Sequence, residues 1–164
     1  MTVDPLELRR VFGGFPSGIA ALSANVAGQP SVLVASSFQV GVSLDPPMVL
    51  FSVQKSSTTW PLLRSAERIG VSILSTSHAH TVRQLASADR SARLEGIEHA
   101  SSEKGAVFIA GASAWLECEI THDYDAGDHR IIVFTVIATD IDEEAAPLVF
   151  HRSGFHGLST IVAG

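Results

Sequence analysis

The chain has 164 residues, of which 46% are hydrophobic, and a formal net charge of −6 at pH 7. A chain of this length buries one substantial core, so we expect a single domain over residues 1–164. Its 11 lysines and arginines are scattered among 17 acidic residues, which argues against nucleic acid or an anionic membrane surface as a partner. Any phosphate that the protein binds must therefore be held by a local cluster of side chains.

The cysteine content and the N-terminal segment bear on location. Cys118 is the one cysteine, which excludes an internal disulfide and a metal site built from paired cysteines. The N-terminal segment MTVDPLELRR lacks the apolar core of a signal peptide, and apolar runs elsewhere stop well short of the roughly 18 residues that cross a membrane. We expect a soluble protein of the reducing cytoplasm.

In chain order, the predicted elements are short strands interrupted by a few helices. A capping aspartate and a first-turn proline predict an amphipathic helix over Asp4–Phe12. Hydroxyl residues at their starts predict helices over 60–66 and 76–88, and the charged segment 89–105 is expected to be an exposed loop. Strands are predicted for runs rich in β-forming residues and bounded by turns: 18–25, 30–38, 48–53, 69–74, 114–124, 130–142 and 147–152.

The two long strands near the C-terminus indicate how the sheet is buried. Leu116, Cys118 and Ile120 alternate with polar residues, so one face of the first strand is expected to be buried. The run Ile131–Ile137 is apolar on both faces and is expected at the centre of the sheet. Many strands with few short helices favour a mainly β fold, a closed or nearly closed antiparallel barrel with Greek-key-like connections, over a layered βαβ fold.

Several common catalytic and nucleotide-binding motifs are missing from the sequence. There is no G-x-G-x-x-G fingerprint, phosphate loop, G-x-S-x-G elbow or H-E-x-x-H zinc helix. His78 and His80 would share a face on a strand but diverge on the predicted helix, so we favour surface histidines over a metal pair and predict no metal site. The thiol of Cys118 is expected to be packed and inert.

Three other segments carry groups that suit a flat, phosphorylated ligand. Lys55 and the hydroxyl residues 56–59 precede a predicted helix, so they form either a phosphate cradle or a plain helix cap with a solvated lysine. Residues 32–38 end in two serines and a phenylalanine, which either admits a flat ligand or simply ends a strand. Gly127 permits a tight turn in which Asp128 orients His129, although a turn with a surface histidine is the plainer interpretation.

In this order, the segments resemble the short-chain flavin reductase family, the reductase components of two-component flavin monooxygenases. The resemblance runs from about residue 8 to residue 158 and rests on FGGFPSGI (12–19), SF (37–38), VSLDPPMVL (42–50), KSST (55–58), VSILS (71–75), GDH (127–129) and PLVFHR (147–152). It implies an FMN-binding split barrel that forms a homodimer, with the flavin near the subunit interface. Members of this family pass a hydride from NADH or NADPH to FMN or FAD and release the reduced flavin to a partner monooxygenase.

The resemblance also implies roles for individual residues. It assigns the isoalloxazine edge to Val34, Ala35, Ser36 and Ser37, and the neighbouring turn to Ser43 and Asp45. The flavin phosphate would be held by Lys55, Ser56, Ser57 and Thr58. His129 would be the catalytic residue beside the nicotinamide. No acid–base pair is required, because the hydride passes between two stacked rings that the protein orients.

Three positions depart from the family pattern and leave alternatives open. Ser36 stands where asparagine is common, Gly14 where arginine is common, and Phe155 where tyrosine is common. Because serine reaches less far than asparagine, the choice between FMN and FAD stays open. No ribose-binding carboxylate or 2′-phosphate-binding arginine is recognisable in the sequence, so NADH is favoured over NADPH by the resemblance alone. The alternatives are a flavin-binding split barrel that retains its cofactor for other chemistry, and a cofactor-free interaction protein whose Lys55 segment is only a helix cap.

Overall fold

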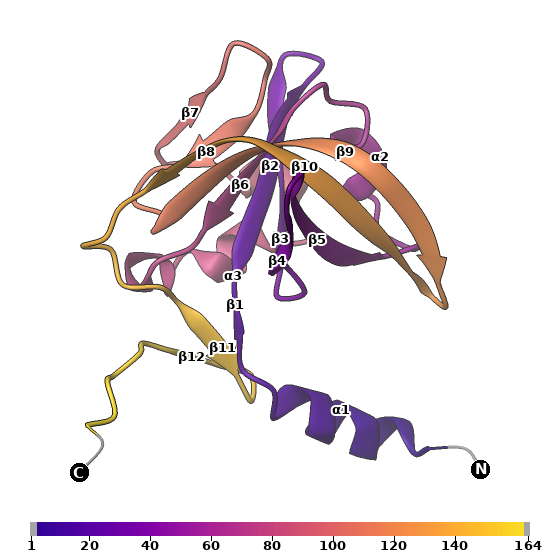
Figure 1. The fold of residues 1–164 in the computed structure, drawn as a ribbon, viewed down its shortest axis with the longest axis vertical. Coiled ribbons are helices and arrows are strands. Elements are labelled where there is room, and N and C mark those ends of the chain that lie inside the picture. Colours follow the sequence, from indigo (N-terminus) through magenta and orange to yellow (C-terminus); the bar gives the residue numbers. More distant parts are fainter. Residues whose placement is uncertain (1–2, 163–164) are drawn as a thin grey trace.

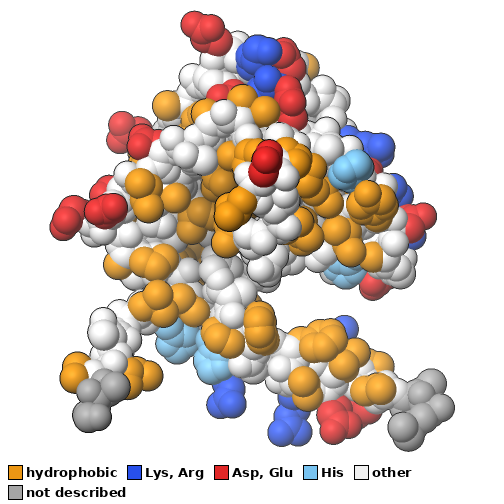
Figure 2. Space-filling model, viewed as in Figure 1, with side chains coloured by type: hydrophobic (Ala, Val, Ile, Leu, Met, Phe, Trp, Pro, Cys, Tyr) orange, Lys and Arg blue, Asp and Glu red, His pale blue; other side chains and the backbone are white. Residues whose placement is uncertain are grey.

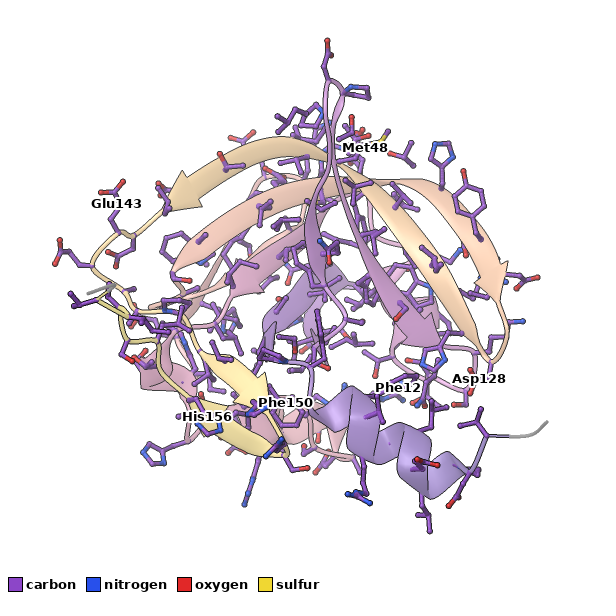
Figure 3. All side chains as sticks on the ribbon, turned by 60° about the horizontal axis from the view of Figure 1, so that its bottom comes forward. Phe12, Met48, Asp128, Glu143, Phe150 and His156 are labelled. Carbon is purple, nitrogen blue, oxygen red and sulfur yellow. The ribbon has the colours of Figure 1, made fainter. Side chains whose placement is uncertain are left out.

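The main sheet curls until strands from its two ends approach each other. A computed structural model describes residues 3–162, in which antiparallel strands pair in the order β3, β2, β6, β9, β10, β5, β4 (Figure 1). Their bounds are β2 Ala20–Val26, β3 Gln29–Ala35, β4 Gln39–Leu44, β5 Pro47–Gln54, β6 Ile69–Ile73, β9 Ala114–Ala126 and β10 His129–Ile141. β9 and β10 arch over the molecule, and register shifts after Val133 and Val136 help to bend them (Figures 1 and 3).

A split in the barrel separates β3 from β5. β3 is one edge of the sheet and β5 lies next to the other edge, so the two strands are not neighbours in the ladder. The hydroxyl of Ser37 bridges them: it donates to the carbonyl oxygen of Ser52 at 2.7 Å and accepts from the Ser52 N–H at 3.2 Å. The expected mainly β, antiparallel split barrel is confirmed, and β10 lies inside the sheet as its apolar run predicted.

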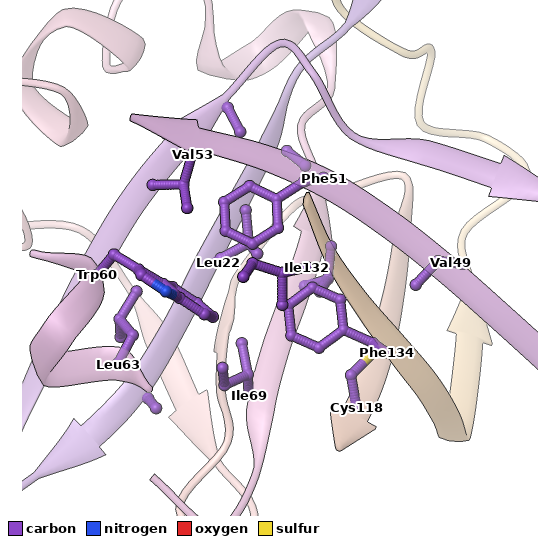
Figure 4. Packing of buried hydrophobic residues seen from close by; sticks show 14 residues of the cluster. Leu22, Val49, Phe51, Val53, Trp60, Leu63, Ile69, Cys118, Ile132 and Phe134 are labelled. Carbon is purple, nitrogen blue, oxygen red and sulfur yellow. The ribbon is translucent and has the colours of Figure 1, made fainter. Parts of the chain in front are cut away.

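An aromatic cluster fills the barrel interior. Phe51 lies between Trp60, at 5.2 Å between ring centroids, and Phe134, at 5.7 Å (Figure 4). Ile132 and Cys118 are fully buried beside them, so the predicted burial of the cysteine is confirmed. Burying each large apolar side chain stabilises the fold by about 1.5–3 kcal/mol, so these residues anchor β5, β9, β10 and the helix that carries Trp60.

A small hairpin lies across β6 because Gly70 has no side chain. β7 (His99–Ser101) pairs with β8 (Val107–Ile109), within and after the segment expected to be a loop. A Cβ at Gly70 would lie 2.0 Å from the carbonyl oxygen of Val107, a distance that atoms cannot adopt. The hydroxyl of Ser23 donates to the same carbonyl at 3.2 Å, so β8 is fixed against β2 and β6.

The helices are shorter than expected, except the first. α1 (Pro5–Gly13) begins where the sequence predicts, with the Asp4 carboxylate accepting from the Leu6 N–H at 3.0 Å. α2 (Trp60–Leu63) is a single turn. The helix expected over 76–88 is wrong as one element: a 3₁₀ turn (η1, Thr76–His78) is followed by α3 (Val82–Leu85), and a second 3₁₀ turn (η2) spans Arg90–Ala92.

His78 explains the break in that predicted helix. Its ring is buried, accepts from the Ser75 N–H at Nδ1 (3.1 Å) and donates from Nε2 to the carbonyl oxygen of Ala110 (2.9 Å). The local bond caps η1, and the bond to Ala110, which is 32 residues away, outweighs helix propensity. The expectation of surface histidines is therefore wrong for His78 and right for His80, which is exposed.

Segments near the two ends of the chain pair with each other below the main sheet, while α1 and the C-terminal tail run to opposite sides (Figure 1). β1 (Ser17–Gly18), β11 (Val149–His151) and β12 (Gly154–His156) form a small sheet, whose last strand the sequence analysis missed. α1 stands off the barrel, buries none of its own residues and presents a band of hydrophobic side chains (Figures 1 and 2). Among residues 3–162, no helix combines the length and apolar character needed to cross a membrane.

Candidate active site

A pocket of about 510 Å³ opens at the split between β3 and β5. Its walls are the end of β3, the end of β5, the loop that follows β5, and the start of β10. It brings together eight of the eleven residues predicted for the site: Val34, Ala35, Ser36, Ser37, Ser56, Ser57, Thr58 and His129. Segments that are far apart in sequence therefore meet at one pocket, and the role of each residue stays a prediction.

The loop after β5 is held by the strand pairing on both sides of it. Gln54 pairs with His129 across β5 and β10, and the Lys55 N–H donates to the Asp128 carbonyl at 3.0 Å. The Ser57 hydroxyl accepts from the Trp60 N–H at 3.1 Å and so satisfies the first N–H of α2, although the N-cap position itself is Thr59. Because α2 is one turn, its dipole adds little, and any attraction for an anion must come from side chains.

The Lys55 side chain does not line the pocket. Its ammonium lies 3.1 Å from a carboxylate oxygen of Asp125, and the hydrogen bond and positive charge of this lysine lower the pKa of Asp125. It borders a neighbouring hollow together with Arg64 and Arg130. To reach a ligand in the pocket, Lys55 would have to leave its partner carboxylate.

Two other predicted residues also lie outside the pocket. Ser43 and Asp45 belong to the hairpin between β4 and β5, whose tip projects into solvent with Leu44 90% exposed. Ser37 does line the pocket, but its hydroxyl already bonds the Ser52 backbone. Ser36 is exposed at the pocket wall, and no hydrogen bond ties its hydroxyl to another of the described residues.

The turn between β9 and β10 fixes the position of His129 where β10 begins, beside the loop that follows β5. Gly127 has a φ of +62°, a conformation that favours glycine, and Ala126 pairs directly with His129 across the turn. Nδ1 of His129 donates to the Asp128 carboxylate at 2.7 Å, and this bond lowers the pKa of Asp128. The carboxylate therefore holds the ring in one orientation, with Nε2 as the nitrogen left for a ligand.

Sequence analysis missed one charged residue of the pocket, Arg93. It lies in the segment expected to be an exposed loop, yet its guanidinium is half-buried and lines the pocket. Desolvation by burial, and then the charge of Arg90, lower its pKa. No local pattern distinguishes this arginine from its charged neighbours, because its partners come from distant segments.

A split antiparallel barrel with a hydroxyl-rich pocket at its split agrees with the comparisons with known proteins. Residues 12–159 match the family described as flavin reductase like domain, and the chain belongs to this family. It is 33% identical over 160 residues to a flavin reductase of Pseudomonas putida, covering 97% of this chain and 93% of the relative. The family expected from the sequence motifs is therefore confirmed.

Two further relatives differ in what their names describe. The chain is 33% identical over 161 residues to an actinorhodin polyketide dimerase of Streptomyces coelicolor, covering 96% of this chain and 89% of the relative. The solved structure of an NADH:FAD oxidoreductase of Streptomyces globisporus C-1027, in complex with NAD and FAD fragments, superposes with a TM-score of 0.89 at 31% identity and 99% coverage of each chain.

Proposed function

We propose that the protein is an NAD(P)H-dependent flavin reductase, which transfers a hydride from NADH or NADPH to FMN or FAD and supplies reduced flavin to a partner monooxygenase. The observation that carries the proposal is the pocket at the barrel split, where small side chains, hydroxyls and His129 converge. The similarity to an NADH:FAD oxidoreductase over the whole chain supports it. It also favours NADH as the donor and makes FAD a flavin to test beside FMN.

The pocket residues fit a flat, phosphorylated cofactor. Val34 and Ala35 end β3 and Ser36 follows it, and the small side chains of Ala35 and Ser36 would leave a planar ring room against the backbone. Hydroxyls of Ser56 and Thr58 lie in the loop that would take the phosphate, and the residues that line the pocket include no carboxylate to repel it. In the proposed site, Lys55 approaches from its place beside Asp125, and Ser43 and Asp45 stand on the neighbouring hairpin.

His129 is the proposed catalytic residue at the nicotinamide side. Bound flavin supplies the hydride acceptor, so the protein needs to orient two rings rather than provide an acid–base pair. Asp128 fixes the imidazole of His129, which would then contact the nicotinamide from a constant position. The Ser36 hydroxyl, just after β3, would donate a hydrogen bond to the flavin edge, where negative charge develops on reduction, whereas the Ser37 hydroxyl already donates to Ser52.

We further propose a cytoplasmic, single-domain chain over residues 1–164 that forms a homodimer. α1 supports the dimer, because Leu6, Val11 and Phe12 are each about two-thirds exposed and nothing within the described chain buries the helix. Covering this apolar surface with a second copy would remove it from water. The match to the family over residues 12–159 supports one domain.

A steady-state assay tests the proposed reaction. Purified protein is mixed under air with NADH or NADPH and with excess FMN or FAD, and nicotinamide absorbance is followed. We expect flavin-dependent loss of NADH, since air reoxidises the released flavin and the cycle repeats. Absence of flavin-dependent turnover with either nucleotide and either flavin would reject the proposal.

A second candidate is a split barrel that retains its flavin and does other chemistry, and the relative named a polyketide dimerase supports the other chemistry. The two candidates differ in how the flavin behaves during dialysis. A reductase of diffusible flavin loses its colour and reduces added flavin, whereas the second candidate stays yellow and does not turn over free flavin.

A further inference from the structure

We infer that Arg93 makes the cationic contact with the phosphate of a flavin bound in the pocket, and that it makes the site select phosphorylated flavins over riboflavin. This inference rests on the proposed flavin-binding function and adds to it the residue that recognises the phosphate.

The guanidinium of Arg93 is held in place by three segments of the pocket wall. Nε donates to the carbonyl oxygen of Ser87 at 2.7 Å, after α3. Nη1 donates to the carbonyl oxygen of Val32 on β3 at 2.8 Å and to the hydroxyl of Thr59 at 2.9 Å. The orientation of the planar group is thus fixed before any ligand arrives, which lowers the entropic cost of using it.

Part of this guanidinium is still available for bonding. Arginine has five N–H donors, and the bonds to Ser87, Val32 and Thr59 use those of Nε and Nη1. Within residues 3–162, no hydrogen bond uses Nη2 of Arg93, while the residue itself lines the pocket. A phosphate oxygen is the acceptor that a guanidinium binds best, with short, charge-assisted hydrogen bonds.

The charge of Arg93 is not neutralised by a neighbouring acid. Among the described residues, no carboxylate oxygen lies within 4.0 Å of the side-chain nitrogens of Arg93 or Arg90. Arg90 adds a second positive group at the same loop, since its Nη1 donates to the carbonyl oxygen of Thr58 at 2.8 Å. Two arginines without an acidic partner, beside hydroxyl groups, favour an anion at this end of the pocket.

Lys55 is a weaker candidate for the same contact. Its ammonium is paired with Asp125, and Asp125 is also bound by Arg130 at 2.9 Å, so Lys55 belongs to a network of alternating charges outside the pocket. Moving the lysine to the ligand would break that pair, whereas Arg93 already stands in the pocket wall. Of the two groups, Arg93 therefore needs less rearrangement to meet a phosphate.

The test compares two ligands that differ in the phosphate alone, FMN and riboflavin. Their dissociation constants are measured by flavin fluorescence with the full-length protein and with Arg93→Gln, Arg93→Lys, Lys55→Gln and Arg83→Gln. Arg83 is the matched control, because it is exposed on α3 outside the pocket. The ratio of the two constants within each variant cancels any general damage to the pocket.

We expect Arg93→Gln to weaken FMN binding by roughly 10- to 100-fold, the worth of hydrogen bonds to a charged group, and riboflavin binding by less than about 3-fold. Arg93→Lys should weaken FMN binding less than Arg93→Gln does, because lysine keeps the positive charge and lacks only the planar set of N–H donors. Arg83→Gln should leave the dissociation constants of both ligands unchanged. If Arg93→Gln does not fold, the test rests on Arg93→Lys, in which the preference for FMN over riboflavin should be smaller than in the unaltered protein.

Two results would overturn the inference while leaving the proposed function intact. Equal weakening of both flavins would mean that Arg93 only holds the pocket walls together, and a larger loss of the FMN preference in Lys55→Gln would place the phosphate contact there. By contrast, unaltered protein that binds neither flavin and oxidises no NADH would reject the proposed function itself, and this inference with it.

Discussion

The imidazole of His129 depends on its neighbour for orientation. Asp128 is almost fully exposed, yet its carboxylate takes a 2.7 Å hydrogen bond from Nδ1, so the ring is kept at the pocket edge rather than free in solvent. Since the site needs no proton transfer from this ring, its proposed contribution is to position the nicotinamide. Positioning and cofactor binding can be separated by kinetics.

Replacing His129 should slow hydride transfer more than it weakens flavin binding. We expect His129→Ala to lower the rate of flavin reduction by roughly 10-fold or more, because misplaced rings lose reactivity steeply, and to change the flavin dissociation constant by less than about 3-fold. Anaerobic stopped-flow measurement gives the rate and fluorescence titration gives the affinity. His80→Ala is the control, since His80 is exposed and outside the pocket; equal losses of rate and affinity in His129→Ala would contradict the assigned role.

The thiol of Cys118 should make stability fall at high pH. Burial, with a smaller effect from Glu117, raises its pKa from 9.0 to about 12, so the folded protein retains the proton to a higher pH than the unfolded chain. The stability from this difference is present below pH 9 and is lost as the pH rises toward 12.

Urea unfolding with a reductant present tests this effect. Between about pH 8 and 10.5 we expect the free energy of unfolding to fall by about 2 kcal/mol more in the unaltered protein than in Cys118→Ala, which lacks the titrating group. The same slope in both proteins would show that the thiol does not titrate as described.

At the scale of elements, the interior strands were predictable and the short peripheral ones were not. Ile131–Ile137 shows its central position directly, since only a strand covered on both faces is apolar on both. β4 has no comparable signal, because it is an edge strand with most side chains exposed and forms by pairing with β5. The predicted helix over 76–88 failed because His78 bonds to Ala110, a contact that local propensity cannot show.

Part of the candidate site could also be predicted from the sequence, and part could not. Motifs located the hydroxyl loop and His129, because each lies in a short segment with recognisable chemistry. Arg93 was missed because its partner Val32 is 61 residues away, and its own segment is rich in charge. The position of Lys55 relative to Asp125 likewise depends on the pairing of β5 with β10, which brings the ends of two hairpins together.

Gly70 makes the contact between β6 and β8 sensitive to one added methyl group. We expect Gly70→Ala to lower the free energy of unfolding by about 1–3 kcal/mol or more, because the backbone of Val107 must move away from the new Cβ. Urea denaturation followed by tryptophan fluorescence measures the change. Gly13→Ala is the matched control, since open space surrounds that position, and an equally small effect at both glycines would contradict the close packing.

At the scale of the whole molecule, α1 should report on assembly. The proposed homodimer covers the helix, so Leu6→Asp/Val11→Asp should shift the protein from the mass of two chains toward that of one in sedimentation velocity experiments. The physical reason is the cost of desolvating two carboxylates in an apolar contact. Glu143→Lys, on an exposed loop elsewhere, should leave the mass unchanged; an unaltered protein that sediments as one chain would contradict the dimer.

The bridge between Ser37 and Ser52 gives the barrel a place to open. Its two hydrogen bonds contribute only about 1 kcal/mol each to stability, far less than a complete ladder such as that joining β9 to β10. Parting the wall at this seam would widen the pocket mouth while the remaining strands stay paired. If reduced flavin leaves through this seam, as release after each cycle of the proposed reaction would allow, only the two hydrogen bonds of the Ser37 hydroxyl would break and the strand ladders would stay intact.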